Sequence, residues 1–337
     1  MALPLALSQG DPAGIGPELA IKAWVNRVES GVPPFLFFGD PRILKQRASL
    51  LGFGDVPVVN ASPETTVATF SEALPVFAID AACPIEPGRP DQKSAPGTIS
   101  AIEAAVKMTM RGKTAAVVTN PIAKSVLYEA GFKFPGHTEF LAELAMKETG
   151  ERYRPVMMLS CPSLKVVPVT IHIPLADVPA ALTADLIVET ARITAHDLTT
   201  RFGIKQPVLA FSGLNPHAGE SGTIGREDED IIRPALQILE REGLKVKGPL
   251  PADTMFHAAA RSSYDAALCM YHDQALIPVK TLGFEDGVNS TLGLPFVRTS
   301  PDHGTAFAIA DKGVADPSSL MEALKLAAQI SSHGTGR

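Results

Sequence analysis

The sequence has little of what marks secreted, membrane-spanning or nucleic-acid-binding proteins. Its three cysteines, Cys83, Cys161 and Cys269, are scattered without CxxC spacing, which argues against a disulfide framework and a cysteine metal knuckle. The opening MALPLALSQGD lacks the basic segment of a signal peptide, and no apolar run is long enough to cross a membrane. Net charge is −6 without blocks of like charge, so neither nucleic acid nor a membrane surface is an expected partner. We expect a cytoplasmic protein with a small ligand.

Three common ligand-binding fingerprints are also absent. The stretch GDPAGIGPE has glycines at positions 10, 14 and 16 but does not fit GxGxxG, and there is no GxxxxGK[ST] loop or GxSxG elbow. P-loop and serine-hydrolase chemistry therefore lose support, and a nicotinamide cofactor would have to be held differently. The glycines and prolines of this stretch instead predict a strand, a tight turn and a helix N-terminus, which can serve a phosphate or simply pack.

What the sequence does have is a regular alternation of short apolar runs with longer helical stretches. With 337 residues, 45% of them hydrophobic, the chain can build two ordinary domains or one large one. Apolar runs such as FLFFG, AAVVTN, PVLAFSG and AALCMY each precede a helical or loop segment, and 183–202 is predicted as a helix. The alternation predicts an α/β fold around a largely parallel sheet.

Polar side chains collect just after the apolar runs, where open α/β sheets bind ligands. His172, His217 and His272 each follow such a run. Three neutral imidazoles with an open position are typical of a catalytic metal site for zinc, nickel, cobalt or ferrous iron. The spacings are too long for a zinc finger or a HExxH helix, so only a folded cleft could unite them. Three unrelated histidines at strand ends remain the alternative.

A second group of residues suggests an anion site. In PGHTEF, His137 and Thr138 stand at a predicted helix N-terminus, which favours negative charge, although Thr138 alone could be an ordinary N-cap. The glycine-rich segment that follows residue 277 supplies Lys280, Asn289 and Arg298. Lysine and arginine are common ligands of phosphate and carboxylate. A surface loop with solvated charges is the competing interpretation, but long irregular loops are often functional.

Several motifs of the chain belong together. In order, they are GDPAGIGPE, TNPIAKS, FPGHTEFLAELA, VTIHIPL, LNPHAGE, GREDED, GPLPADTMF, YHDQALIPVKTLGF and VNSTLGLPFVRTSPDHGTA. Through these motifs the chain resembles, from about residue 5 to about residue 330, the 4-hydroxythreonine-4-phosphate dehydrogenases of pyridoxal phosphate biosynthesis.

The resemblance implies an isocitrate/isopropylmalate dehydrogenase-like fold, with two α/β/α domains and a cleft between them. We expect residues 1–130 plus 273–337 to form the first domain and residues 131–272 a middle, dimer-forming domain. The implied assembly is a homodimer whose active site takes residues from both subunits. The implied cofactors are NAD or NADP, whose binding residues we do not assign, and one divalent metal per site (Zn, Mg, Co or Mn).

The resemblance also implies roles for individual residues. His172, His217 and His272 match the metal ligands, and the substrate-binding positions match His137, Thr138, Lys280, Asn289 and Arg298. Asp273 is expected to orient an imidazole, and Lys280 or a metal-bound water is the candidate general base. One departure is Ala308 and Asp311 in AFAIADKG, where many relatives have an aspartate and an AG pair.

The implied reaction is oxidation of 4-phosphooxy-L-threonine to a β-keto acid that decarboxylates to 3-amino-2-oxopropyl phosphate. Alternative substrates are 4-phospho-D-threonate, D-erythronate phosphate or a dihydrodiol. A metal-dependent phosphohydrolase and a metal-stabilised binding protein are rivals from other functional classes.

Overall fold

The chain forms two compact units, each built from β-strands and helices. The computed structural model describes residues 3–54, 56–81, 84–134 and 136–333. Unit 1 comprises Met1–Pro155 and Leu294–Ser332, and unit 2 is built from Val156–Gly293. Strands and helices alternate through both units, so the predicted α/β class is confirmed.

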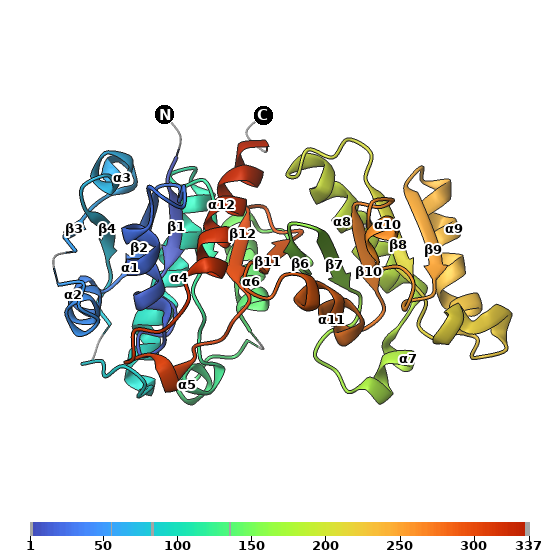
Figure 1. The fold of residues 1–337 in the computed structure, drawn as a ribbon, viewed down its shortest axis with the longest axis horizontal. Coiled ribbons are helices and arrows are strands. Elements are labelled where there is room, and N and C mark those ends of the chain that lie inside the picture. Colours follow the sequence, from blue (N-terminus) through green and yellow to red (C-terminus); the bar gives the residue numbers. More distant parts are fainter. Residues whose placement is uncertain (1–2, 55, 82–83, 135, 334–337) are drawn as a thin grey trace. The chain divides into compact units, whose positions relative to one another are not determined.

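Unit 1 is built on a wholly parallel sheet in the order β3-β4-β2-β1-β5-β12. Its last strand comes from the far end of the chain and pairs with β5, and Figure 1 shows this strand, β12, in orange-red in the same unit as the blue strands β1 and β2. The central strands β1, β2 and β5 are fully buried and mainly apolar, as expected for a parallel sheet covered by helices. The strands of unit 1 are β1 (Leu5–Ser8), β2 (Phe35–Gly39), β3 (Val58–Asn60), β4 (Leu74–Ala78), β5 (Val117–Thr119) and β12 (Arg298–Pro301).

The helices of unit 1 begin largely at prolines and polar caps. Asp40, for example, caps its helix by accepting a hydrogen bond from the backbone N–H of Arg42, and Pro41 occupies the first turn. These helices are α1 (Gly16–Val25), α2 (Pro41–Leu50), α3 (Pro63–Phe70), α4 (Ala95–Met110), α5 (Lys124–Glu129), α6 (His137–Thr149) and α12 (Ser318–His333).

Unit 2 has a mixed sheet in the order β11-β6-β7-β10-β8-β9. The pairs β11/β6 and β6/β7 are antiparallel, whereas β7, β10, β8 and β9 run parallel. The strands are β6 (Val156–Cys161), β7 (Leu164–Pro168), β8 (Val208–Ser212), β9 (Lys245–Leu250), β10 (Ala266–Cys269) and β11 (Val288–Leu292). The helices are α7 (Val178–Ala181), α8 (Ala184–Thr200), α9 (Arg233–Arg241), α10 (Ala258–Arg261) and α11 (His272–Leu282).

The unit boundaries lie about 20 to 25 residues later in the chain than we expected, after Pro155 and Gly293. Helix α6 belongs to unit 1 because Phe140 and Leu141 share a buried core with Ile102 of α4. Helix α11 belongs to unit 2 because Leu276 and Val279 pack with the strands of that unit. Apolar packing of these two helices, which alternation of elements does not reveal, therefore moves both boundaries.

The GDPAGIGPE stretch forms the strand, turn and helix start that its composition predicts. A buried guanidinium stabilises the turn: Arg47, 1% exposed, donates hydrogen bonds to the carbonyls of Pro12 and Gly14 and to that of Ala310. The turn is thereby tied to the segment with the unusual Ala308 and Asp311, both of which are exposed.

The cysteines of the described residues form no disulfide bond. Cys161 and Cys269 are buried free thiols, and Cys83 lies outside the described residues. No helix in the described ranges has both the length and the apolar character needed to span a membrane.

Candidate functional site

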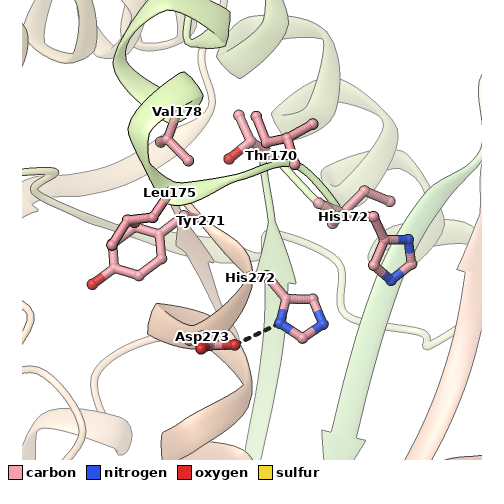
Figure 2. A pocket seen from close by; sticks show the side chains of 9 residues that line it. Thr170, His172, Leu175, Val178, Tyr271, His272 and Asp273 are labelled. Atoms are coloured by element: carbon pink, nitrogen blue, oxygen red, sulfur yellow. Dashed lines mark hydrogen bonds and ion pairs between the residues drawn. The ribbon is translucent and has the colours of Figure 1, made fainter.

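Two of the three predicted metal-binding histidines lie together in unit 2. His172 follows β7 and His272 is the first residue of α11, and their ring centroids are 5.6 Å apart. Both line a cavity of about 240 Å³ whose other walls include Tyr271 and Leu175 (Figure 2). His172 has a φ of 51°, in the left-handed region that non-glycine residues seldom adopt. Strained backbone of this kind is concentrated at functional sites.

Asp273 lies within hydrogen-bond distance of the ring of His272. The Asp273 Oδ1 atom lies 2.7 Å from Nδ1 of His272, and Figure 2 shows His272 between this carboxylate and His172. When Nδ1–H donates a hydrogen bond to a carboxylate, Nε2 is the ring nitrogen whose lone pair can bind a metal ion. Metal-ligating histidines commonly use this arrangement. The hydrogen bond that the orienting role of Asp273 requires is therefore present.

A buried amide fixes the start of α11 against the end of β8. Gln274 accepts hydrogen bonds at Oε1 from the Ser212 hydroxyl (2.6 Å) and the Met270 backbone N–H (2.7 Å). Its Nε2 donates to the Gly213 carbonyl at 2.7 Å. Since His272 opens α11 and His217 follows β8, this network links the chain segments that carry two predicted ligands.

His217 lies on an unusual turn. It begins a run of five residues, His217–Ser221, all with positive φ between 42° and 76°, and only Gly219 in that run is a glycine. Each L-residue in this conformation costs roughly 1–2 kcal/mol, so the run must be held by its surroundings. His217 itself is exposed.

His217 does not form a metal-binding group with His172 and His272 in the described part of the chain. Across the described ranges, no three His, Cys, Asp or Glu side chains are grouped so that they could hold a metal ion. The three-histidine ligand set therefore stays a prediction. The chemistry of the donors fits a metal: His172 and His272 are adjacent imidazoles, and one is already oriented by a carboxylate. Exposed side chains such as His217 commonly change rotamer when a ligand binds.

Lys280 and Asn289 are also in unit 2, away from the walls of the histidine cavity. Lys280 lies eight residues after His272 on α11, with its Nζ 6.0 Å from the ring centre of Phe284. Asn289 is half-buried in β11, opposite Leu159. Neither lines the cavity beside His272. Their substrate-binding role, and that of Lys280 as a base, stay predictions.

In unit 1, Arg298 is a deeply buried cation. It is 4% exposed, opens β12 and donates hydrogen bonds from Nε and Nη2 to the hydroxyl of Thr119 at the end of β5. Burial lowers the pKa of Arg298 to about 10, which still leaves it charged at neutral pH. Desolvation of this kind makes a guanidinium a strong binder of phosphate or carboxylate.

His137 lies within the electrostatic reach of Arg298. Its pKa is held well below the usual value of 6.5, chiefly by burial and then by the charges of Arg298 and Lys124. Its Nε2 is buried and has no hydrogen-bond partner within the described part of the chain. Thr138 follows in the first turn of α6, whose N-cap is Gly136, so the interpretation of Thr138 as the N-cap is wrong. The predicted anion site thus combines a helix N-terminus, a neutral imidazole and a buried cation.

Lys124 is the residue of this cluster to which the sequence analysis gave no role. It begins α5, and its charge acts on His137. It belongs to the TNPIAKS motif, which was noted as part of the resemblance and was the one signal that could have identified it.

Comparison with known proteins gives consistent matches over nearly the whole chain. A family model described as "Pyridoxal phosphate biosynthetic protein PdxA" matches residues 32–327. A protein of Xanthobacter autotrophicus named 4-hydroxythreonine-4-phosphate dehydrogenase is 57% identical over 97% of this chain and 93% of its own length. The crystal structure of a 4-hydroxythreonine-4-phosphate dehydrogenase from Klebsiella pneumoniae aligns with a TM-score of 0.87, at 35% identity, over 98% of both chains.

A more distant solved structure is also similar. A terephthalate 1,2-cis-dihydrodiol dehydrogenase from Burkholderia xenovorans aligns with a TM-score of 0.65, at 28% identity, over 98% of both chains. The fold is therefore shared by proteins whose names differ in the compound oxidised.

Proposed function

The chain belongs to the PdxA family of pyridoxal phosphate biosynthetic proteins, and we propose on this basis that it oxidises 4-phosphooxy-L-threonine with NAD or NADP and a divalent metal. The geometric observation that supports the proposal most directly is the pairing of His172 and His272 at one cavity, with Asp273 bonded to His272. The reaction forms a β-keto acid, which loses CO₂ to give 3-amino-2-oxopropyl phosphate.

His172, His217 and His272 would hold the metal. When bound, Zn²⁺, Mg²⁺, Co²⁺ or Mn²⁺ would lower the pKa of a coordinated hydroxyl and polarise a carbonyl. Asp273 keeps the Nδ1 side of His272 occupied, so the imidazole presents Nε2. Lys280 is the proposed base that takes the hydroxyl proton, in competition with a water molecule.

Arg298, His137 and Thr138 would bind the phosphorylated substrate, together with Asn289. Support comes from the burial of Arg298 and from the position of His137 at the N-terminus of α6. A cation that has already lost its hydration gains more from an anion than an exposed one does. A neutral His137 can donate or accept one hydrogen bond without adding charge.

The dinucleotide would accept the hydride, because hydride transfer is chemistry that the cofactor supplies while the protein binds and orients it. One buried atom fits an amide donor of such a ligand: Oδ1 of Asn120, directly after β5, has no hydrogen-bond partner within the described residues, while its Nδ2 donates to the Ser8 carbonyl. Steady-state kinetics with each dinucleotide distinguishes NAD from NADP as the hydride acceptor.

The proposal includes a homodimer with a shared active site. Unit 2 exposes large apolar side chains close in sequence to the histidines: Leu175 is 68% exposed, Ile277 64% and Phe284 77%. We propose that the partner subunit covers these side chains, because exposed apolar surface marks interfaces when it is gathered into a patch. Light scattering after gel filtration measures the mass directly, and a monomer at micromolar concentration would remove this part of the proposal.

A related substrate is the second candidate. The similarity to a dihydrodiol dehydrogenase shows that the fold accommodates other compounds, so 4-phospho-D-threonate and D-erythronate phosphate remain competitors. The histidines would keep their roles, and only contacts to the amino or hydroxyl group of the substrate would differ.

One assay separates these candidates. Purified protein is incubated with NAD⁺ and either 4-phosphooxy-L-threonine or 4-phospho-D-threonate, with and without a chelator, and NADH absorbance is followed. Chelator-sensitive NADH from the L-threonine compound is the expected result. NADH from the D-threonate compound alone would move the enzyme to sugar-acid catabolism. Release of inorganic phosphate without NADH would favour a phosphohydrolase, and tight metal retention with no turnover would favour a binding protein.

A further inference from the structure

A buried carboxylate that does not belong to the predicted ligand set lies next to the left-handed run His217–Ser221. Asp228 is completely buried. Its Oδ1 accepts a hydrogen bond from the backbone N–H of Leu214 at 2.9 Å. Its Oδ2 accepts from Asn215 twice, from the backbone N–H at 3.2 Å and from Nδ2 at 2.9 Å.

Asn215 passes this constraint on to the turn. Its backbone carbonyl accepts a hydrogen bond from the N–H of Ala218 at 3.0 Å, which closes the chain around His217. The Asn215 side chain also donates to Glu227 at 2.8 Å, so its amide is anchored by two neighbouring acidic residues. His217 therefore lies between two residues whose positions depend on the Asp228 carboxylate.

The backbone on both sides of His217 is shaped to admit this carboxylate. A Cβ atom on Gly213 would lie 2.6 Å from Oδ1 of Asp228, and a Cβ on Gly219 would lie 3.1 Å from Oδ2. Side chains at these positions would push the carboxylate out of the turn. Gly219 also adopts a φ of 76°, which suits glycine. The strained run and the buried carboxylate are thus one packed unit.

We propose that Asp228 is a positioning residue for His217: it fixes the left-handed turn so that the imidazole is presented for metal binding. This inference rests on the proposed function, in which His217 is a metal ligand. Asp228 is not itself a ligand, because it is inaccessible and its oxygens are occupied by three donors. Residues that orient a metal ligand without contacting the metal typically contribute 10- to 100-fold to metal affinity.

The adjacent acidic residues provide matched controls. Glu229 and Asp230 are next to Asp228 in sequence, but they pair on the surface with Arg233 and Arg226, four residues away. Asp230→Asn removes the same charge from the same segment without touching the turn. It is expected to leave metal affinity unchanged.

The test measures Zn²⁺ binding alone, by competition with a chromophoric chelator, on the full chain. Asp228→Asn is expected to weaken Zn²⁺ binding about 10- to 100-fold. In the His217→Ala background, the same substitution is expected to have no further effect, because the ligand it positions is gone. A purely structural role would weaken binding equally in both backgrounds, and that result would overturn the proposal, as would wild-type affinity in Asp228→Asn.

A second variant covers the case in which Asp228→Asn fails to fold, judged by circular dichroism. Asn215→Ala removes one donor to Asp228 but keeps both backbone donors, and it is expected to weaken Zn²⁺ binding by a smaller factor that also vanishes without His217. An effect that persists without His217 would overturn the proposal.

Failure of the proposed reaction would look different. If Zn²⁺ binding depends on His217 and Asp228 while no NADH forms from any substrate, the positioning role stands and the proposed function is lost. If Zn²⁺ binding does not depend on His217, the positioning role is lost whatever the NADH assay gives.

Discussion

The guanidinium of Arg298 and the hydroxyl of Thr119 meet at 2.6 Å where two parallel strands, β12 and β5, run side by side. The two residues are 179 positions apart in sequence. Thr119 accepts from both Nε and Nη2, which fixes the plane of the guanidinium fork. A fixed, buried fork recognises an oxyanion with little loss of side-chain entropy.

Arg298→Lys keeps the charge but loses the fork. We expect KM for the phosphorylated substrate to rise about 10- to 100-fold, equivalent to the roughly 1.5–3 kcal/mol of a charge-assisted hydrogen bond, with a smaller change in kcat. Steady-state kinetics with varied substrate measures this directly. Arg111→Ala, an exposed arginine of the same unit, is the control, and an unchanged KM in Arg298→Lys would return Arg298 to a structural role.

His137 should make stability depend on pH. Because its pKa in the folded chain is far below 6.5, the unfolded chain binds more protons below pH 6.5. Its contribution to stability is therefore complete above that pH and is lost as the pH falls. Between pH 7 and pH 5, His137→Gln should lose about 1–2 kcal/mol less unfolding free energy than wild type. Urea titrations at the two pH values test this. Equal losses in both proteins would contradict it, and the exposed His196→Gln should behave as wild type.

Asp11, in the GDPAGIGPE turn, should make stability depend on pH in the opposite direction. It is 3% exposed, and burial raises its pKa from 3.8 to about 6 despite a hydrogen bond from the Ala13 N–H. The Asp11 carboxyl ionises at a lower pH in the unfolded chain than in the folded chain. The free energy of unfolding therefore falls as the pH rises from 3.8 to about 6, and it stays reduced above that range.

Asp11→Asn keeps an acceptor for Ala13 and removes the charge. We expect it to raise the free energy of unfolding by roughly 2 kcal/mol at pH 7.5, with a gain about 1–2 kcal/mol smaller at pH 4.5. Chemical denaturation at both pH values measures the difference. The exposed Asp253→Asn should change neither value, and a gain independent of pH would show that burial does not raise the pKa of Asp11 in the folded chain.

Asp273→Asn tests the orientation of His272. The carboxylate side chain is 71% exposed, so we expect the low end of the usual range for such residues, about a 10-fold loss of Zn²⁺ affinity. Activity should return when Zn²⁺ is supplied at saturating concentration, because the ligands themselves are intact. Glu285→Gln, an exposed change in the loop that follows α11, serves as the control. Activity that stays low at saturating Zn²⁺ would place Asp273 in the chemistry itself.

The sequence predicted features that depend on local patterns. Apolar runs and the glycine turn identify most strands, and the helix expected at 183–202 appears as α8, Ala184–Thr200. His172 and His272 were expected to follow strands, and they do; the pairing of β7 with β10, which brings their rings to 5.6 Å, comes from the structure alone.

Features set by contacts far apart in sequence were not predictable. The left-handed run at His217 depends on Asp228, and the effect of Lys124 on His137 depends on how α5 and α6 pack. The unit boundaries were misplaced for the same reason, since only the packing of Phe140 and Val279 decides where α6 and α11 belong.

The return of the chain to unit 1 has a consequence for its synthesis. Unit 1 needs β12 and α12, and the Thr299 hydroxyl of β12 donates to the Ala323 carbonyl of α12 at 2.8 Å. Residues 156–293 of unit 2 leave the ribosome before β12 does, so the edge of β5 that pairs with β12 has to wait for the last segment of the chain. A truncated or stalled nascent chain would therefore contain the strands that carry His172 and His272 but a unit 1 that still lacks Arg298.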